Sequence, residues 1–389
     1  MGVSRRYLMI ERNGDMEQKL LAYLKEHEAE IFADLKELVL AEASTSDIDQ
    51  LAHVREVLIR LIKERTGSDT FVYEAKGGHN PMKFEFGQGD GTVLLIGHYD
   101  TVCPIGSMEL RQEGNELHGP GVLDMKSGLV SAIWSMKAYR DLGIDPGKCL
   151  RMVINGDEEI RSPESSSIIC EQAQGCKAAL VCEPCTSNGD LKTGRKGSIG
   201  FEVTIHGKAT HAGNNHKGGI NAIEEMAREI QYVHSLTDYE AGTTLNVGIC
   251  SGGTKANVVP DLASYTVDCR YMKMSEGERI RGLLTNLAVS VPGTTREVAV
   301  DEGMPPMEQT PGNLGLFDLA TQCGKKLGLS FSHQFVGGGS DGNKVSAMGV
   351  PTLDGLGAWG DGAHAVNEHI LIDQYVPRIA LLASLILKI

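Results

Sequence analysis

Apolar residues recur along the first part of the chain at the spacing of amphipathic helices. Leu20, Leu24 and Ile31 fall on one side of such a helix, and charged residues fall on the other. Because side chains three or four residues apart share one face of an α-helix, the pattern predicts helices over 17–42 and 48–65.

The pattern then changes to short, nearly continuous apolar runs that alternate with helical segments. Strands are predicted within 71–86 and at 92–96, 150–154 and 178–182, and helices at 126–142 and 164–175. Strands that are apolar on both faces and joined by helices are typical of a parallel sheet covered on both sides. Active groups in such sheets lie at the carboxyl ends of the strands.

From residue 197 the order of elements differs. Strands are predicted at 198–206, 244–251, 263–270 and 296–301, and helices at about 219–234 and 276–290. This βαββαβ order is typical of a small split sandwich with one open sheet face. After about residue 310 the α/β pattern returns with a helix, a strand near 350–353 and a C-terminal helix.

Length and element order together predict two domains. A chain of 389 residues is too long for one ordinary core. We predict a large α/β domain, residues 1–196 and 306–389, with a mostly parallel sheet and helices on both faces. A ferredoxin-like βαββαβ domain, residues 197–305, is inserted into it.

The charge of the chain limits the kinds of partner. The sequence holds 37 basic and 51 acidic residues, a net charge of −14, whereas nucleic acid or an anionic membrane would need a basic face. No run approaches the roughly 20 apolar residues of a membrane span. The basic residues near the N-terminus precede the charged segment 11–15, so we expect no secretory signal.

Nine cysteines at irregular spacing favour reduced thiols and a cytoplasmic location. Cys182 and Cys185 have the CxxC spacing of a redox motif or a zinc ribbon. A redox motif would open a helix and a zinc ribbon would need a second pair, so we expect packed core cysteines instead.

Histidine and carboxylate side chains gather where the predicted strands of the large domain end. His98 and Asp100 end one apolar run, Glu158 and Glu159 follow another, and Glu183 follows a third. An acidic residue at the end of a buried strand is costly unless it is paired or bound to a metal. The spacing of two places Asp100 on the same side as His98, where it can hold the second ring nitrogen of a metal-bound imidazole.

Asp124, in a glycine-rich turn before a predicted helix, and His364, in a Gly- and Asp-rich segment, extend this set. Each residue has an ordinary alternative. Asp124 fits a helix N-cap, the glutamate pair fits a solvated acidic turn, and His98 fits a strand end beside a neighbouring Asp. Together they supply what two divalent metals and a hydrolytic water need, which predicts an enzyme.

The same residues stand in motifs that resemble the M20 family of co-catalytic zinc peptidases, closest to its glutamate carboxypeptidase branch. The resemblance covers nearly the whole chain after about residue 16. The motifs are Gly97-His-Tyr-Asp-Thr-Val102, Gly119-Pro-Gly-Val-Leu-Asp-Met-Lys126, Asn155-Gly-Asp-Glu-Glu159, His206-Gly-Lys-Ala-Thr-His-Ala-Gly213, Val267-Asp-Cys-Arg270 and Gly337-Gly-Gly-Ser-Asp341.

That resemblance implies two metal sites that share one carboxylate. Asp124 would bridge the ions, His98 and Glu183 would complete one site, and Glu159 and His364 would complete the other. Five His and carboxylate ligands without a thiolate suit a zinc pair, with cobalt or manganese as substitutes.

The resemblance also assigns roles beside the metals. Asp100 would orient His98, and Glu158 would be the general base that takes a proton from the attacking water and delivers it to the leaving amine. A cis peptide bond between Asp124 and Met125 is implied as well.

Substrate and partner residues follow from the same resemblance. The inserted domain would form a homodimer, in which His211 reaches the active site of the partner subunit and stabilises the oxyanion. Arg270 and Asn257 would hold a free carboxylate of the substrate, for which Arg is suited by bidentate pairing. Gly339 and Ser340 are also assigned to substrate binding.

The predicted function is that of a metal-dependent hydrolase acting on an amide bond next to a free carboxylate: a carboxypeptidase, a dipeptidase or an N-acyl-amino-acid deacylase. The segment after Asp301 lacks the arginines of the glutamate-releasing branch, and the segment 192–197 also differs. Preference for a C-terminal glutamate therefore does not follow. A biosynthetic deacylase of the acetylornithine or succinyl-diaminopimelate type is an alternative. A non-catalytic binding module is disfavoured, because every ligand position is filled.

Overall fold

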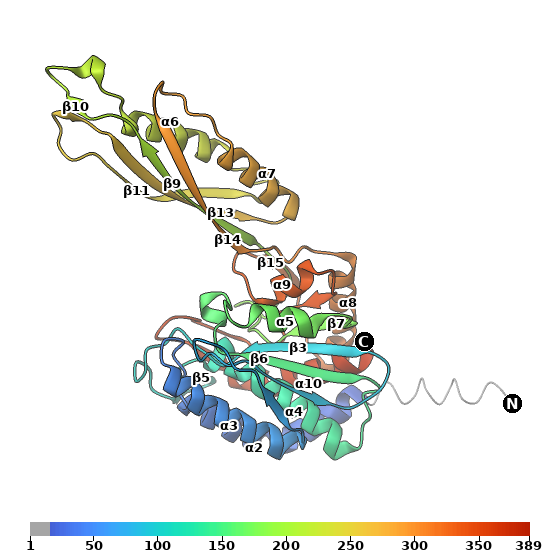
Figure 1. The fold of residues 1–389 in the computed structure, drawn as a ribbon. Coiled ribbons are helices and arrows are strands. Elements are labelled where there is room, and N and C mark those ends of the chain that lie inside the picture. The colour runs from blue at the N-terminus through green and yellow to red at the C-terminus, as the bar shows by residue number, and fades with distance from the viewer. Residues whose placement is uncertain (1–15) are drawn as a thin grey trace. The chain divides into compact units, whose positions relative to one another are not determined.

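The structure, a computed structural model, describes residues 16–389 and divides into two compact units (Figure 1). The smaller unit holds residues 195–308 and 337–339, and the larger unit holds the rest. The predicted insertion, residues 197–305, lies within the smaller unit. The backbone of Arg195 exchanges hydrogen bonds with that of Met307, and its guanidinium donates to the carbonyls of Gly338 and Gly339.

The larger unit is built on a six-stranded sheet in the order β1-β2-β6-β3-β7-β16. The strands are β1 (Thr70–Val72), β2 (Met82–Phe86), β3 (Thr92–His98), β6 (Cys149–Asn155), β7 (Ala178–Val181) and β16 (Thr352–Leu353). The last four run parallel to one another, whereas β2 is antiparallel to both of its neighbours, β1 and β6. This confirms the predicted mostly parallel sheet.

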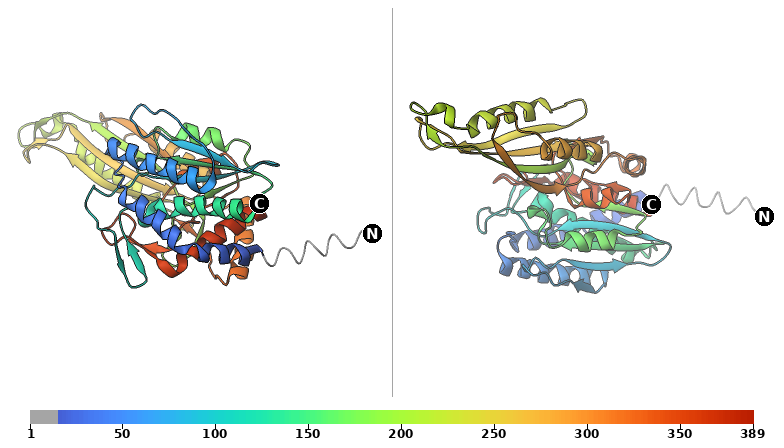
Figure 2. Two further views of the ribbon diagram at one scale, coloured as in Figure 1. Left: turned by 90° about the horizontal axis from the view of Figure 1, so that it is seen from below. Right: turned by 45° about the horizontal axis from the view of Figure 1, so that its top comes forward.

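Helices cover both faces of this sheet (Figures 1 and 2). One layer contains the helical residues 16–26 with α2 (Glu28–Leu40), α3 (Ile48–Thr66), α4 (Ser127–Leu142), α8 (Pro311–Leu327) and α10 (Ile372–Lys388), and the other contains α5 (Ser166–Ala173) and α9 (Asp341–Ala347). In β3, Val93 and Leu95 join the core of the first layer, and Leu94 and Ile96 join that of the second. Successive side chains of a strand point to opposite faces, so a continuously apolar strand needs a core on each side.

A second, small sheet of the larger unit was not predicted. Its order is β17-β18-β5-β4, from β4 (Arg111–Glu113), β5 (Glu116–His118), β17 (Gly360–Asp361) and β18 (His369–Leu371), all antiparallel. Strands of two or three residues offer too few positions for alternation to be recognised. In addition, β8 (Leu191–Arg195) pairs with β15 (His333–Val336).

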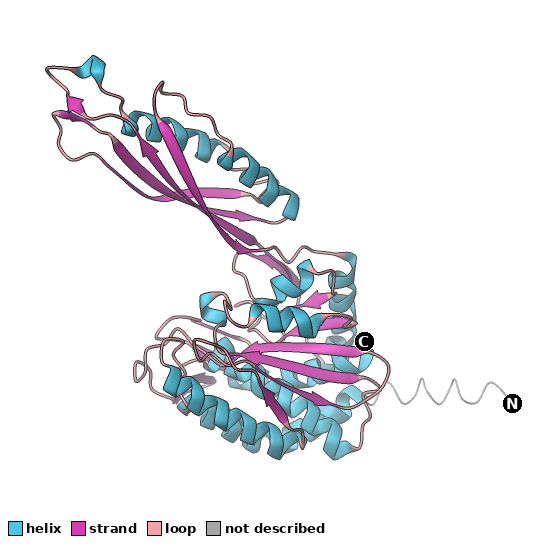
Figure 3. Cartoon of the chain, in the orientation of Figure 1, coloured by secondary structure: helices cyan, strands magenta, loops and turns pink. Residues whose placement is uncertain are grey.

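The smaller unit is a four-stranded antiparallel sheet in the order β11-β13-β9-β14, with two helices on one face (Figure 3). Its elements are β9 (Gly197–His206), α6 (Ala222–Ser235), β11 (Thr244–Gly252), β13 (Leu262–Tyr271), α7 (Met274–Thr285) and β14 (Thr295–Met304). This is the predicted ferredoxin-like order, although α7 ends at Thr285 rather than near residue 290. On the face away from the core, β9 and β13 expose polar residues such as Glu202 and Asp268.

A separate two-stranded ladder of the smaller unit pairs β10 (Thr210–His211) with β12 (Val258–Val259). None of the helices within residues 16–389 has the length and apolar character to cross a membrane.

Candidate metal centre

The five predicted metal ligands converge at the carboxyl ends of the parallel strands. His98 is the last residue of β3, and Glu183 follows β7. Glu159 lies in a short 3-10 turn (Glu158–Ile160) after β6, and Asp124 lies in the turn Val122–Lys126 that precedes α4. His364 comes from the loop between β17 and β18. Parallel strands bring these distant segments to one edge of the sheet.

Asp124 lies between the two histidines. Its Oδ1 is 3.2 Å from Nε2 of His98, and its Oδ2 is 3.4 Å from Nε2 of His364. The His98 Nε2 is also 3.3 Å from Oε1 of Glu183, and the His364 Nε2 is 3.0 Å from Oε2 of Glu159. Two half-sites, each with one histidine and one further carboxylate, therefore share the carboxylate of Asp124.

These separations suit a metal centre. Donor atoms 2.0–2.1 Å from a tetrahedral zinc ion are about 3.3 Å apart, and the four contacts of the half-sites measure 3.0–3.4 Å. Oε1 of Glu159 is buried and has no hydrogen-bond partner within the described part of the chain. Imidazole nitrogens and carboxylate oxygens without thiolates are the donors that zinc, cobalt or manganese accept.

The charges of the centre are strongly coupled. Burial acts to lower the pKa of His98, but its hydrogen bonds with Asp100, Asp124 and Glu183 outweigh burial and leave this pKa well above its usual value. Asp124 and Glu159 raise the pKa of His364 to about 10. The carboxylates thus stabilise the protonated imidazoles of His98 and His364. A metal cation bound at the two half-sites would take the place of these protons.

Asp100 ties His98 to the glutamate pair. It is fully buried, and its Oδ1 is 3.3 Å from Nδ1 of His98. The Asp100 carboxylate also accepts hydrogen bonds from the backbone nitrogens of Glu158 and Glu159 and from the hydroxyl of Thr45. A carboxylate at Nδ1 keeps the proton on that atom and leaves Nε2 free to face the half-site.

Glu158 contributes a carboxyl group that is a weaker acid than an ordinary glutamate. Its carboxylate lies within 4.8 Å of donor atoms of His98 and Glu183. Burial raises the pKa of Glu158 well above its usual value; His98 opposes this, and the charge of Glu183 adds to it. A raised pKa makes the Glu158 carboxylate a stronger base, which suits a group that takes a proton from water and later returns it.

Comparison with known proteins identifies the family. Residues 94–388 match the model of the peptidase family M20/M25/M40. The chain belongs to this family. Carboxypeptidase G2 of Pseudomonas sp. (strain RS-16) is 28% identical over 371 residues, which cover 92% of this chain and 89% of that protein.

Other relatives agree with this membership. A succinyl-diaminopimelate desuccinylase of Variovorax paradoxus (strain S110) is 24% identical over 303 residues, 72% of this chain and 76% of that protein. The crystal structure of aminopeptidase PepT from Bacillus cereus has the same fold, with a TM-score of 0.79 at 20% identity over 93% of this chain and 98% of that one. The predictions of an M20-type hydrolase and of metal dependence are confirmed.

Glu368 is a carboxylate of this M20 centre that sequence analysis missed. It is 1% exposed, and its Oε1 accepts hydrogen bonds from the backbone nitrogens of Leu123 and Asp124 at 2.8 and 2.9 Å. Its Oε2 accepts one from Gly121 at 3.1 Å. Glu368 therefore holds the turn that presents Asp124, where the Asp124–Met125 peptide bond is cis, as expected.

Burial raises the pKa of Glu368 to about 7, although the three backbone donors favour its charged form. In the sequence Glu368 looks like an ordinary loop glutamate four residues after His364. Only the fold shows that it is enclosed, so we regard it as a positioning residue.

The CxxC pair is part of the core. Cys182 and Cys185 are 0% and 5% exposed, and both are free thiols. Burial raises the pKa of the Cys182 thiol far above its usual value, which keeps it protonated and unreactive. The interpretation as packed cysteines is confirmed.

Four of the predicted functional residues belong to the smaller unit. His211 and Asn257 lie close together, because Asn257 precedes β12, the partner strand of β10, and its carbonyl accepts a hydrogen bond from Ala212. Nδ1 of His211 accepts hydrogen bonds from the backbone nitrogens of Gly213 and Asn214. The imidazole is exposed and carries its proton on Nε2, where it can donate to an oxyanion.

The other two residues of this group lie elsewhere in the smaller unit. Arg270 is near the end of β13 and donates from Nε to both carboxylate oxygens of Asp268 at 3.1 and 3.0 Å. The Gly339 carbonyl accepts a hydrogen bond from Arg195 at 3.0 Å.

Ser340, which was also assigned to substrate binding, lies in the larger unit. Its hydroxyl is the N-cap of α9: it accepts a hydrogen bond from the backbone nitrogen of Gly342 and donates to Asp354 at 2.7 Å. The side chain is 0% exposed. The Ser340 hydroxyl is thus used within the fold, and its assignment to substrate binding stays a prediction.

Proposed function

We propose that the chain is a co-catalytic zinc hydrolase that cleaves an amide or peptide bond next to a free carboxylate. Carboxypeptidase, dipeptidase and N-acyl-amino-acid deacylase activities fit this description. The observation that carries the proposal is the position of Asp124, whose two oxygens face His98 and His364. This arrangement supports a bridging role for Asp124 between two ions, with cobalt or manganese as alternatives to zinc.

The proposed chemistry divides the work between the ions and the side chains. When bound, two such ions lower the pKa of a water molecule and polarise the carbonyl group that it attacks. Glu158 takes a proton from that water as the new C–O bond forms. Glu158 then gives the proton to the nitrogen of the breaking C–N bond, so that an amine and a carboxylic acid leave. Asp100 keeps His98 in the required tautomer.

A cavity beside Glu159 is proposed to receive one side chain of the substrate. It has a volume of about 550 Å³. Its lining combines hydroxyl-bearing and apolar side chains: Ser44, Thr45, Ser46, Ile48, Thr101, Val102 and Ile160, with Gly77, His79 and Glu159. Its mixed lining admits a substrate group of moderate size with both apolar and polar parts.

The free carboxylate of the substrate is assigned to Arg270 and Asn257, and Gly339 is also assigned to substrate binding. Arg270 offers a planar set of donors that fits a carboxylate, and its Nε already donates to both carboxylate oxygens of Asp268. A substrate would compete with Asp268 for this guanidinium group.

We further propose a homodimer formed through residues 197–305. The edge strand β11 is nine residues long, exposes 69% of Ile249, and within residues 16–389 has a partner strand on one side only. An exposed edge of this length is suited to pairing with a second copy about a two-fold axis. His211 would then serve the metal centre of the partner subunit. All nine cysteines are free, which suits a cytoplasmic location.

The proposal is tested with metal-loaded protein and a panel of N-acyl amino acids and dipeptides. We expect hydrolysis of compounds whose scissile amide is next to a free carboxylate, and little hydrolysis of the corresponding carboxamides and methyl esters. Equal rates on free and amidated compounds, or no hydrolysis in the panel, would contradict it.

A biosynthetic deacylase is the second candidate, favoured by the similarity to succinyl-diaminopimelate desuccinylase. N-succinyl-diaminopimelate and N-acetylornithine therefore belong in the panel. Turnover of one of them at least tenfold above that of the dipeptides would select this alternative.

A further inference from the structure

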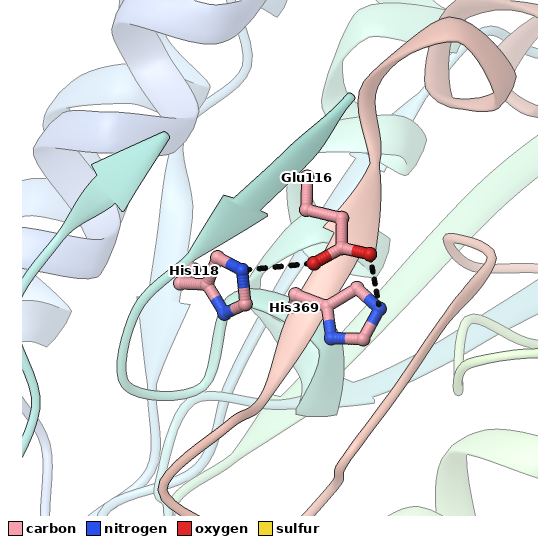
Figure 4. Close-up of side chains that lie close together, drawn as sticks. All are labelled: Glu116, His118 and His369. Atoms are coloured by element: carbon pink, nitrogen blue, oxygen red, sulfur yellow. Dashed lines mark hydrogen bonds and ion pairs between the residues drawn. The ribbon is translucent and has the colours of Figure 1, made fainter. Parts of the chain in front are cut away.

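Two histidines and a glutamate meet on the small sheet of the larger unit, separate from the five ligands of the catalytic centre (Figure 4). His118 of β5 is the direct cross-strand partner of His369 of β18. Glu116 precedes His118 by two residues in the same strand, so its side chain lies on the same face. Figure 4 shows the Glu116 carboxylate between the two imidazole rings.

The distances bring three donor atoms together. Oε2 of Glu116 is 3.1 Å from Nε2 of His118, and its Oε1 is 3.8 Å from Nε2 of His369. Donor atoms of all three residues lie within 4.8 Å of one another. The limit of 4.8 Å exceeds the separation of about 3.3 Å around a tetrahedral ion by about 1.5 Å. Binding of an ion would draw the three side chains closer, and the Glu116 side chain, which is 42% exposed, has room to turn.

The position of the ring proton of His369 leaves two acceptor atoms facing each other, Nε2 of His369 and Oε1 of Glu116. Its Nδ1 is 2.9 Å from the carbonyl oxygen of Asn367, which only accepts, so Nδ1 carries the proton. In the neutral ring Nε2 then has a lone pair, and it points at an oxygen of Glu116 that also has only lone pairs to offer. A second proton or a cation between them resolves this contact. A backbone carbonyl at Nδ1 is also the usual partner of a metal-bound histidine.

His118 provides the second observation. The residue is 4% exposed, and its Nδ1 is buried without a hydrogen-bond partner in the part of the chain that the structure describes. The nitrogen that faces the cluster is Nε2, 3.1 Å from Oε2 of Glu116, so an ion there would take the Nε2 lone pair and place the ring proton on Nδ1.

The charges around the cluster also favour a cation. In the same row of the sheet, Asp361 is the cross-strand partner of His369, and Arg111 is that of His118. The guanidinium of Arg111 is paired with Glu113 at 2.6 Å, which offsets its charge. Apart from Arg111, the row holds two imidazoles and a carboxylate.

We propose that Glu116, His118 and His369 form a binding site for one divalent transition-metal ion, in addition to the catalytic centre. Two imidazoles and one carboxylate favour Zn²⁺, Ni²⁺ or Cu²⁺ over the all-oxygen preferences of Ca²⁺ and Mg²⁺. Solvent would complete the coordination on the exposed side of Glu116. This inference stands on the geometry of the small sheet and does not rest on the proposed function.

The ion would act as a link between two segments of the catalytic centre. Gly121 lies three residues after His118, and Glu368 directly precedes His369. Gly121 and Glu368 are already joined by a hydrogen bond. A metal between β5 and β18 would hold these segments together independently of that hydrogen bond. Binding to the folded state alone stabilises it, so zinc should raise the melting temperature.

The test is zinc counting on untagged, full-length protein that has been stripped with a chelator and dialysed against Zn²⁺. His369→Gln and Glu116→Gln should each bind about one zinc fewer per chain than the wild type. The matched control is His53→Gln, which removes an exposed histidine of α3 and should leave the count unchanged. Zinc should also raise the melting temperature less in His369→Gln than in the wild type.

A second pair of variants separates this site from the catalytic one. In Asp124→Asn protein, one zinc per chain should remain, and it should be lost in Asp124→Asn/Glu116→Gln. Equal zinc counts in the wild type, His369→Gln and Glu116→Gln would overturn the proposal and leave protonated His369 as the partner of Glu116. Loss of zinc in Glu116→Gln without any loss in Asp124→Asn would contradict the catalytic assignment alone.

Discussion

Glu368 accepts a hydrogen bond from the backbone nitrogen of Asp124 at 2.9 Å, although the two residues are 244 positions apart in the chain. The same carboxylate holds Leu123 and Gly121 through their backbone nitrogens. The residue proposed to bridge two metals therefore stands on a turn whose shape depends on a side chain from the other end of the sequence.

Replacement of Glu368 by Gln should weaken metal binding without removing a ligand. The amide keeps one acceptor oxygen, but its NH₂ group would face a backbone N–H in place of the second oxygen. Changes of residues that support metal ligands typically reduce affinity or activity by about 10–100-fold. Metal affinity is measured by competition with a chromophoric chelator, and we expect a loss of this order with a lower kcat.

The matched control is Glu225→Gln in the smaller unit. Glu225 is also 1% exposed and accepts hydrogen bonds from backbone nitrogens, those of Ser290 and Val291. The Glu225→Gln substitution should lower the melting temperature of the protein and leave its metal affinity unchanged. An equal effect of both substitutions on metal affinity would show that Glu368 acts only through general stability.

Removal of the shared carboxylate should affect both half-sites. Asp124→Asn keeps the size of the side chain but loses the charge that faces His98 and His364. We expect loss of about two metal ions per chain, whereas His98→Ala or His364→Ala should retain one of the pair. Metal content after dialysis, measured by atomic emission, gives these numbers. Retention of both ions by Asp124→Asn would show that it does not bridge them.

Glu158→Gln separates proton transfer from metal binding. The amide cannot take a proton from water, so turnover should fall by about 10²–10⁴-fold. The metal content should stay near that of the wild type, because Glu158 is not among the five proposed ligands. A variant that loses metal together with activity would make Glu158 a ligand instead.

Much of this centre could be predicted because its residues follow buried strands. An apolar run such as 92–96 shows both where a parallel strand lies and where it ends, and the sheet then brings His98, Glu159 and Glu183 together. Glu368 could not be found in this way. Its burial depends on contacts with a turn far away in sequence, and it lies between an irregular loop and the three-residue strand β18.

The small sheet and Ser340 show the same limit. Strands such as β5 and β18 have three residues each, too few for a period to appear, so the meeting of His118 and His369 is visible only in the fold. Ser340 stands next to Gly339 in a motif, but its local geometry makes it a helix cap. Motif membership places a residue near a site and does not determine where its side chain points.

Arg378 should be important for the stability of the larger unit. It is 3% exposed, and its guanidinium donates hydrogen bonds to the carbonyls of Gly189, Gly355 and Gly357. Arg378→Met fills a similar space but leaves these carbonyls unpaired, at a cost of about 3 kcal/mol. The midpoint of urea unfolding should fall clearly. Arg228→Met, at an exposed ion pair of α6, should change it little.

The proposed role of His211 in the partner subunit can be tested by complementation. A dimer that combines one His211→Ala chain with one Glu158→Gln chain has one metal centre with both defects. The other centre has an intact Glu158 from its own chain and an intact His211 from its partner. Each homodimer alone should be nearly inactive, because both of its centres carry the defect.

Mixing the two inactive proteins under conditions that exchange subunits should therefore restore activity. Random exchange gives mixed dimers as half of the population, each with one of two centres intact, so about one quarter of the wild-type activity should return if the centres act independently.

The matched control mixes Glu158→Gln with Asp124→Asn, which place both defects in residues of the larger unit. Every centre then stays defective, and no activity should return. Mixed dimers that form, as seen by native mass spectrometry, but remain inactive would show that His211 does not act in trans. A strictly monomeric protein would exclude the dimer as well.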